Sequence, residues 1–195
     1  LCGNIQIAAQ TIHLLCDAEI PIVHLSRGHW FHGITRGITL RNAYDRAAQY
    51  RAAADPGRAV AFAKAVVAAK AQNQRTMLVR NAGGRADVEL VEMGTLLRKV
   101  SLAEDFGALL GLEGGIAAKY FSRFGELLRP HDFEAAWDFN SRNRRPPRDP
   151  VNALLSFGYS LLAKECTVAL LSEGLDPWWG LFHQPRHGRP ALALD

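Results

Sequence analysis

The spacing of apolar and polar positions separates a short mixed N-terminal part from a long helical part. Residues 4–7 alternate polar and apolar side chains, which predicts a half-buried strand. Residues 20–25 and 30–35 are rich in β-branched and aromatic side chains and predict two more strands. An apolar stripe over 10–18 predicts a short helix. We interpret residues 1–38 as the remainder of a small β-rich domain.

Helical patterns dominate from residue 39 onward. Good helix formers, or apolar residues at helical spacing, predict helices over 41–54, 58–81, 90–100, 102–110, 114–128 and 150–173. The last of these begins at Asp149-Pro150 and ends before Gly174. Because it is apolar nearly all round, we expect it to be the buried central helix. The predicted fold class is α+β, with a mainly α-helical domain over residues 39–195.

Composition places the chain among soluble globular proteins. Its 195 residues are 48% hydrophobic and 22% charged, which fits one domain or two small ones and excludes a disordered or collagen-like chain. The longest apolar run contains Lys164 and Glu165, so no membrane-spanning helix is expected. Three scattered cysteines and no secretory signal predict a cytoplasmic protein. Since the chain starts at Leu1 and stops within an apolar run, we expect both ends to continue in a longer protein.

Basic charge is concentrated in the first half of the chain. Residues 1–100 contain 13 Lys and Arg against 7 Asp and Glu, whereas residues 101–195 contain 10 against 12. The excess falls on the predicted helices within residues 41–80. A basic element beside a mildly acidic half is typical of a nucleic-acid surface next to a carboxylate metal site, although a solvated helix face has the same composition.

Three separate residues are candidate metal ligands. Glu113 lies in an apolar, glycine-flanked setting, His183 follows a pair of tryptophans, and Asp195 ends an apolar run. Two carboxylates and an imidazole suit Mg²⁺ or Mn²⁺, and such an ion can polarise a phosphodiester. Each residue also has a purely structural explanation, as a helix N-terminal acid, a hydrogen-bonded core histidine and a surface acid.

Arginines supply the candidate phosphate contacts. A segment stiffened by prolines contains four of them within seven residues, and others lie near His183 and on the basic helices. Guanidinium groups bind phosphate oxygens in pairs of hydrogen bonds, although a solvated basic loop would have the same sequence. The candidates for nucleic-acid binding are Arg142, Arg144, Arg145, Arg148, Arg189, Arg41 and Arg75.

Taken in order, these motifs resemble the CRISPR spacer integrases of the Cas1 family. The matching residues are Glu113-Gly114, 144–159 (RRPPRDPVNALLSFGY), 174–177, His183 and 188–195. Earlier segments also fit, so the resemblance covers nearly the whole chain, and the proline–arginine segment and the C-terminal motif are its most specific parts.

The resemblance implies a β-rich N-terminal domain joined to a helical catalytic domain. It implies a homodimer that assembles with Cas2, acts on double-stranded DNA and inserts short fragments into a CRISPR array. A Cas4 nuclease, fused or separate, is a further expected partner. Glu113, His183 and Asp195 match the family's metal ligands, but the family commonly has another acid about one helical turn beyond Asp195 that is usually counted as the third ligand.

The predicted function is therefore a metal-dependent DNA integrase and endonuclease that uses Mg²⁺ or Mn²⁺. A DNA 3′-hydroxyl would attack a phosphodiester of the repeat, while the arginines hold the backbone rather than read bases. The alternative is a non-catalytic DNA-binding scaffold whose partner performs the chemistry. An enzyme acting on a small phosphorylated substrate is disfavoured, because such a substrate would not need a basic surface spread over two helices.

Overall fold

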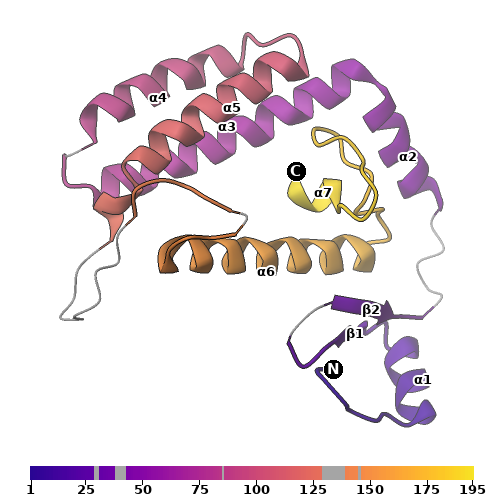
Figure 1. Ribbon diagram of the computed structural model, residues 1–195. Coiled ribbons are helices and arrows are strands. Elements are labelled where there is room, and N and C mark those ends of the chain that lie inside the picture. The colour runs from indigo at the N-terminus through magenta and orange to yellow at the C-terminus, as the bar shows by residue number, and fades with distance from the viewer. Residues whose placement is uncertain (29–30, 38–42, 85, 129–138, 145) are drawn as a thin grey trace. The chain divides into compact units, whose positions relative to one another are not determined.

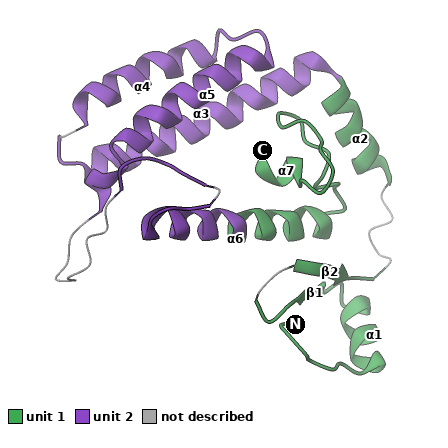
Figure 2. Ribbon diagram, in the orientation of Figure 1, with its two compact units in different colours: residues 1–54, 161–194 green, residues 55–160, 195 purple. Residues whose placement is uncertain are grey.

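The computed structural model describes residues 1–28, 31–37, 43–84, 86–128, 139–144 and 146–195 (Figure 1). The described part is mostly helical, and its elements are α1 (Ala9–Asp17), β1 (Ile22–Leu25), β2 (Phe31–Thr35), α2 (Ala43–Ala54), α3 (Pro56–Asn81), α4 (Asp87–Val100), α5 (Phe106–Ser122), the 3₁₀ helix η1 (Phe124–Leu127), α6 (Pro150–Ser172) and α7 (Ala191–Leu194). The chain divides into two compact units (Figure 2): unit 1 holds residues 1–54 and 161–194, and unit 2 holds residues 55–160 and 195. The domain boundary at residue 38 stays a prediction.

Unit 1 contains an antiparallel pair of strands. β1 pairs with β2 so that Val23 lies opposite Ile34, with an irregularity after His24. The amino group of Leu1 donates to the carbonyl of Val23 at 2.7 Å, which ties the start of the chain to β1. The strands predicted within residues 20–25 and 30–35 and the helix predicted over 10–18 are confirmed as β1, β2 and α1. The described residues hold a sheet of two strands, and the larger β-rich domain stays an expectation.

The strand predicted over residues 4–7 is wrong. Gly3 has a φ of 75°, and the amide of Ile5 donates to the carbonyl of Gly3 at 3.0 Å. The chain therefore turns after a single bridge between Cys2 and Leu25. Alternation of polar and apolar residues indicates a strand only where a neighbouring strand supplies hydrogen-bond partners, and the turn at Gly3 removes the segment from β1.

Unit 2 is built on three helices, α3, α4 and α5, that pack side by side (Figure 1). α3 begins as the sequence predicts, because Asp55 caps it by accepting a hydrogen bond from the amide of Arg58 at 3.1 Å and Pro56 occupies its first turn. Its buried stripe repeats every four residues up to Ala71, continues at Leu78 and is formed mainly by small side chains, which let the neighbouring helices approach: Ala59, Ala63, Val67, Ala71 and Leu78.

A single helix, α5, replaces the two helices predicted over 102–110 and 114–128. Asp105 caps it by accepting a hydrogen bond from the amide of Ala108 at 2.7 Å. The glycines between the two predicted segments lie inside the helix. A Cβ atom at Gly115 would lie 3.3 Å from Cδ1 of Leu96 in α4, so α5 packs closely against α4 at this glycine. The expectation that Glu113 stands at a helix N-terminus is therefore wrong, since it lies in the middle of α5.

α6 has the predicted bounds but not the predicted burial. It begins at Pro150, and the chain leaves it at Gly174, whose φ is 79°. Leu154, Phe157 and Leu162 are more than half exposed, so the expectation of a buried central helix is wrong. An apolar composition indicates that a helix can be buried, but it does not show which residues bury it. By length and composition alone α6 is long and apolar enough to cross a membrane despite Lys164 and Glu165, and the core helix of a soluble protein meets the same two criteria.

Candidate functional site

Glu113 occupies the buried stripe of α5. It follows the fully buried Leu109 by four residues and precedes Ile116 by three, so all three share one face of the helix. Its side chain is 18% exposed. A carboxylate in such a stripe is costly unless it is paired. The position therefore needs a compensating charge, or a ligand.

Lys70 of α3 supplies that charge. Its Nζ donates to Oε1 of Glu113 at 2.5 Å, while its own side chain is 48% exposed. The two residues are 43 positions apart, and only the packing of α3 against α5 brings them together. Sequence reasoning missed this pair. The sequence of α3 gives no signal for it, because Lys64 and Arg75 lie as close to the buried stripe as Lys70 does.

The other two predicted ligands, His183 and Asp195, come from the C-terminal part of the chain. His183 lies in unit 1, half-buried, with its ring edge-on to the buried Phe182 at 5.3 Å between centroids. Asp195 directly follows α7 and is also half-buried. No three His, Cys, Asp or Glu residues gather as a metal site within the described residues. The ligand set stays a prediction.

Helix α2 holds the segment that leads to His183. Gln49, buried in α2, donates through Nε2 to the carbonyls of Asp176 and Trp179 at 2.8 Å, and its Oε1 accepts from the amide of Asp176 at 2.9 Å. Tyr50 donates to Oδ2 of Asp176 at 2.8 Å, and this hydrogen bond raises the pKa of the tyrosine. The turn of residues 176–179 is thus fixed by side chains that no sequence motif singled out.

Helix α7, which follows the loop that carries His183, is joined to the turn of residues 176–179. The amide of Leu192 in α7 donates to the carbonyl of Pro177 at 2.9 Å, and Pro177 is fully buried. Between them, Arg186 and Arg189 form a tight antiparallel bridge with Gly188 at a φ of 69°. The candidate phosphate contact Arg189 therefore lies, half-buried, in a turn of unit 1.

The proline–arginine segment is fastened to the first turn of α6 by Asn152, which is fully buried. Its Nδ2 donates to the carbonyl of Ser141 and to Oδ2 of Asp149 at 2.8 and 2.7 Å. Its Oδ1 accepts from Nη1 of Arg142 and from the amide of Asn143 at 2.7 and 3.0 Å. One side chain therefore joins the two ends of this loop.

Asp149 completes the network as the cap of α6. Its Oδ1 accepts from the amide of Asn152 at 2.7 Å, and its Oδ2 also accepts from Nδ2 of Asn143 at 3.1 Å. These hydrogen bonds, the one from the Asn152 side chain above all, hold the pKa of Asp149 below its usual value. The carboxylate therefore stabilises both the helix N-terminus and the loop.

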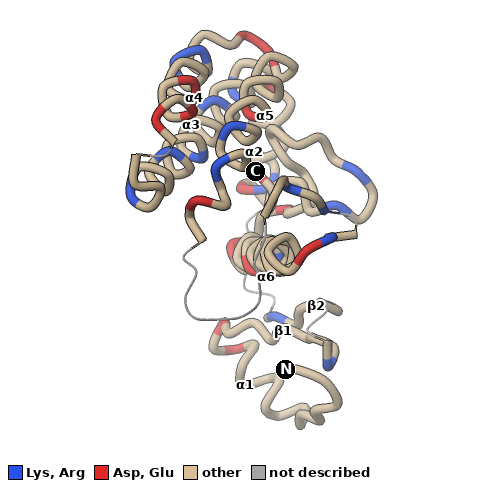
Figure 3. The backbone as a smooth tube through the Cα atoms, turned by 60° about the vertical axis from the view of Figure 1, so that its left-hand side comes forward, with Lys and Arg blue, Asp and Glu red and all other residues tan. Residues whose placement is uncertain are grey.

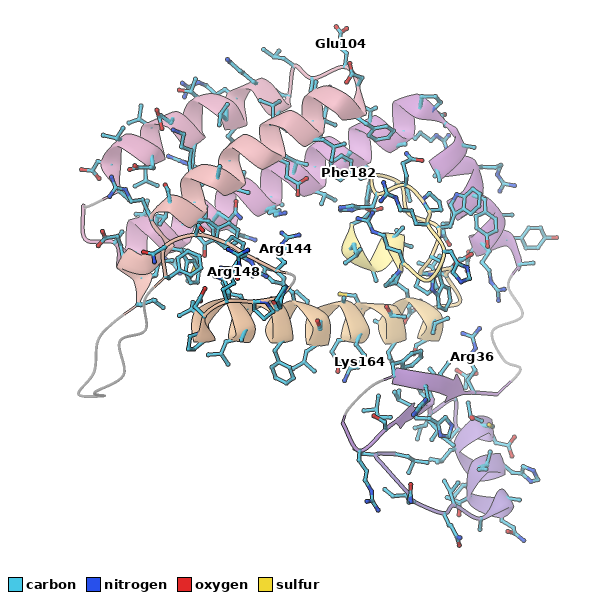
Figure 4. The ribbon with its side chains drawn as sticks, in the orientation of Figure 1. Arg36, Glu104, Arg144, Arg148, Lys164 and Phe182 are labelled. Carbon is cyan, nitrogen blue, oxygen red and sulfur yellow. The ribbon has the colours of Figure 1, made fainter. Side chains whose placement is uncertain are left out.

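The four arginines of this segment differ in their surroundings. The guanidinium group of Arg142 bonds to Asn152 and lies over the ring of Tyr159, 5.7 Å from its centroid, and burial lowers the pKa of Arg142. Arg144 and Arg148 are exposed on the loop (Figure 4). Arg145 lies outside the described residues.

Several basic side chains of helix α3 are engaged in contacts within the protein. Figure 3 shows Lys and Arg residues along α3, but Lys64 donates to the carbonyl of Ser101 at 3.1 Å, and Lys70 pairs with Glu113. The half-buried candidate Arg75 donates to the carbonyl of Leu90 in α4 at 3.4 Å. The candidate Arg41 lies outside the described residues. Sequence composition alone did not distinguish these basic side chains from solvent-facing ones.

Comparison with known proteins identifies the family. The model of the family "CRISPR associated protein Cas1" matches residues 1–195. A Cas4 exonuclease/Cas1 endonuclease fusion of Geobacter sulfurreducens is 45% identical over 202 residues, covering 100% of this chain and 36% of that protein. The chain thus spans about a third of that relative.

Two solved structures share the fold. A partial Cas6-RT-Cas1–Cas2 complex matches with a TM-score of 0.79 and 30% identity, over 100% of this chain and 58% of that one. A casposase bound to its integration product matches with a TM-score of 0.70 and 25% identity, over 97% of this chain and 55% of that one. On the strength of the full-length family match, the chain belongs to the Cas1 family of CRISPR-associated proteins.

Proposed function

We propose that this protein is a DNA integrase and endonuclease of CRISPR adaptation, which acts by transesterification: a DNA 3′-hydroxyl attacks a phosphodiester of a repeat, and the phosphorus–oxygen bond to the repeat's own 3′-oxygen breaks. The observation that carries the proposal is the half-buried carboxylate of Glu113 in the apolar stripe of α5, at the Glu-Gly motif. The relatives support it, because one is named an endonuclease fusion and another was solved with an integration product.

The proposed cofactor is Mg²⁺ or Mn²⁺, held by Glu113, His183 and an acid at or after Asp195. A set of carboxylates and one imidazole fits these ions by its chemistry. When bound, such an ion polarises the scissile phosphate and stabilises the charge on the departing oxygen. The chain's own contribution is positional: Gln49 fixes the turn that precedes His183, and α5 presents Glu113 from a packed helix.

The exposed arginines would bind the DNA backbone. Arg144 and Arg148 stand on a loop that Asn152 and Asp149 hold in one conformation, so little ordering is needed when phosphates bind. Arg142 would act through the loop, since its guanidinium group is engaged by Asn152. Double-stranded DNA, a second copy of the chain, Cas2 and a Cas4 nuclease are the proposed partners.

Strand joining on a supercoiled plasmid tests the proposal. The full-length protein is compared with Glu113→Ala, with Mn²⁺ or with EDTA and in the presence of the Cas2 partner. We expect joined products that disappear with EDTA and with Glu113→Ala. The matched control is Glu92→Ala in α4, which also removes a carboxylate paired with a lysine, Lys119, at 2.6 Å and should leave joining intact.

The scaffold alternative predicts a different outcome of the same experiment. If the wild-type protein binds DNA in a salt-sensitive manner but forms no joined product with the partner present, the chain holds DNA for another enzyme. Glu113 would then be a structural residue, and the integrase proposal would be rejected.

A further inference from the structure

The ion pair between Lys70 and Glu113 is asymmetric in its exposure. The carboxylate is 18% exposed on the packed face of α5, whereas the lysine side chain is 48% exposed. In the comparable pair of Lys119 and Glu92, the two side chains are about equally exposed, at 41% and 44%. In the first pair the carboxylate is therefore fixed by packing, and the ammonium group is the partner that can move into solvent.

We propose that Lys70 is a positioning residue that holds the Glu113 carboxylate before a divalent cation arrives and couples cation binding to DNA binding. The inference rests on the proposed function, because it takes Glu113 as a cation ligand. The ammonium group lies 2.5 Å from Oε1, so it occupies one side of the carboxylate that a cation would approach.

A divalent cation and the ammonium group repel each other at this distance. Lys70 must therefore leave Glu113, or the cation binds more weakly. Leaving costs little steric rearrangement, since the lysine stem is flexible and its side chain is 48% exposed. The released ammonium group needs a new anionic partner, and a DNA phosphate near the cation supplies one.

The consequence is positive coupling between the two ligands. DNA lowers the cost of releasing Lys70 and so tightens cation binding, and by reciprocity the cation tightens DNA binding. Without DNA the lysine keeps the cation affinity low. The protein would then hold its cation most firmly once the substrate is in place.

Manganese binding tests this coupling without relying on activity. The signal of free aqueous Mn²⁺ in electron paramagnetic resonance is titrated with the full-length protein, alone and with a DNA duplex, and binding by the duplex alone is subtracted. We expect DNA to tighten Mn²⁺ binding by wild type. We expect Lys70→Met to bind Mn²⁺ about tenfold more tightly without DNA, because one nearby positive charge is gone. In Lys70→Met, DNA should then tighten Mn²⁺ binding less than it does in wild type.

Two further lysine variants separate charge from shape. Lys70→Arg keeps a positive charge and should retain weak Mn²⁺ binding with a strong gain from DNA. Lys119→Met removes another lysine of the same unit that pairs with a glutamate, and it should match wild type in Mn²⁺ binding. The denaturation midpoint of each variant confirms that it is folded. Because Lys70→Met leaves the mostly buried Glu113 carboxylate unpaired, it should lower the midpoint more than Lys119→Met, whose partner Glu92 is 44% exposed.

The outcomes distinguish this inference from the function on which it rests. If Glu113→Gln binds Mn²⁺ as well as wild type does, the proposed cation site is wrong, and the inference is rejected with it. If binding requires Glu113 but Lys70→Met changes neither the affinity nor the gain from DNA, the coupling alone is rejected. Lys70 would then serve only the packing of α3 on α5.

Discussion

Replacing Asn152 with alanine removes four hydrogen bonds at once from a fully buried side chain. Two of them involve a charged partner, Arg142 or Asp149, and hydrogen bonds of that kind contribute about 1.5–3 kcal/mol each, against about 0.5–1.5 kcal/mol for neutral ones. Simple addition overestimates the loss, because one side chain makes all four and water can reach the half-buried Arg142. We expect Asn152→Ala to lower the free energy of unfolding by about 3 kcal/mol.

Chemical denaturation followed by circular dichroism measures this loss. The matched control is Ser160→Ala on the same helix, whose hydroxyl bonds only back to the carbonyl of Ser156 at 2.8 Å and whose loss should cost less than about 0.5 kcal/mol. Asn152→Asp keeps an acceptor for Arg142 but places a carboxylate against Asp149, so it should also destabilise the protein. An Asn152→Ala variant within about 1 kcal/mol of wild type would refute the reasoning, since it would mean that water replaces the network without cost.

Three further predictions follow from the same contacts. First, hydrogen bonds lower the pKa of Asp149 in the folded protein, so the stabilisation that they supply is complete above the unfolded pKa of about 3.9 and is lost as the pH falls through the lower folded value. Asn152→Ala lacks one of these hydrogen bonds, so its denaturation midpoint should fall less than that of wild type as the pH is lowered from about 5. Second, Gln49→Ala removes three hydrogen bonds from a buried side chain and should speed amide exchange over residues 176–179, measured by mass spectrometry, while Arg51→Ala on the exposed face of α2 should not. Third, Arg144→Ala and Arg148→Ala should each reduce the slope of log DNA affinity against log salt by about 0.9, because each lost phosphate contact releases about one counterion fewer. Arg98→Ala in α4 should leave the slope unchanged. Unchanged slopes in the first two variants would remove both arginines from the DNA interface.

Features of the fold that depend on residues adjacent in the sequence could be predicted from the sequence. The starts of α3 and α6 follow from an aspartate cap and a proline in the first turn, and the end of α6 follows from Gly174. The break predicted between residues 110 and 114 is wrong, because the glycines around Glu113 suggested one where α5 is continuous. In a packed helix a glycine can lie at a close contact with a neighbouring helix, as Gly115 does beside Leu96, and helix propensity carries no information about that neighbour.

The candidate site shows the same limit more sharply. Glu113 could be nominated from the sequence because its motif is local, but its partner Lys70 is brought to it only by the packing of two helices. Gln49 likewise reaches across 127 residues to Asp176. Neither contact has a spacing or composition signature, since both depend on which helix faces meet. The set of Glu113, His183 and Asp195 stays a prediction.

The proline–arginine segment shows why composition cannot assign roles within a motif. Arg142 and Arg144 are two residues apart, and from sequence each is an equally good phosphate contact. In the structure the guanidinium group of Arg142 bonds to the buried Asn152, whereas Arg144 is exposed. Phosphate binding by Arg142 would break a hydrogen bond to a buried side chain, and binding by Arg144 would not. We therefore expect loss of Arg142 to alter the loop and DNA affinity together, and loss of Arg144 to weaken DNA binding with the loop intact.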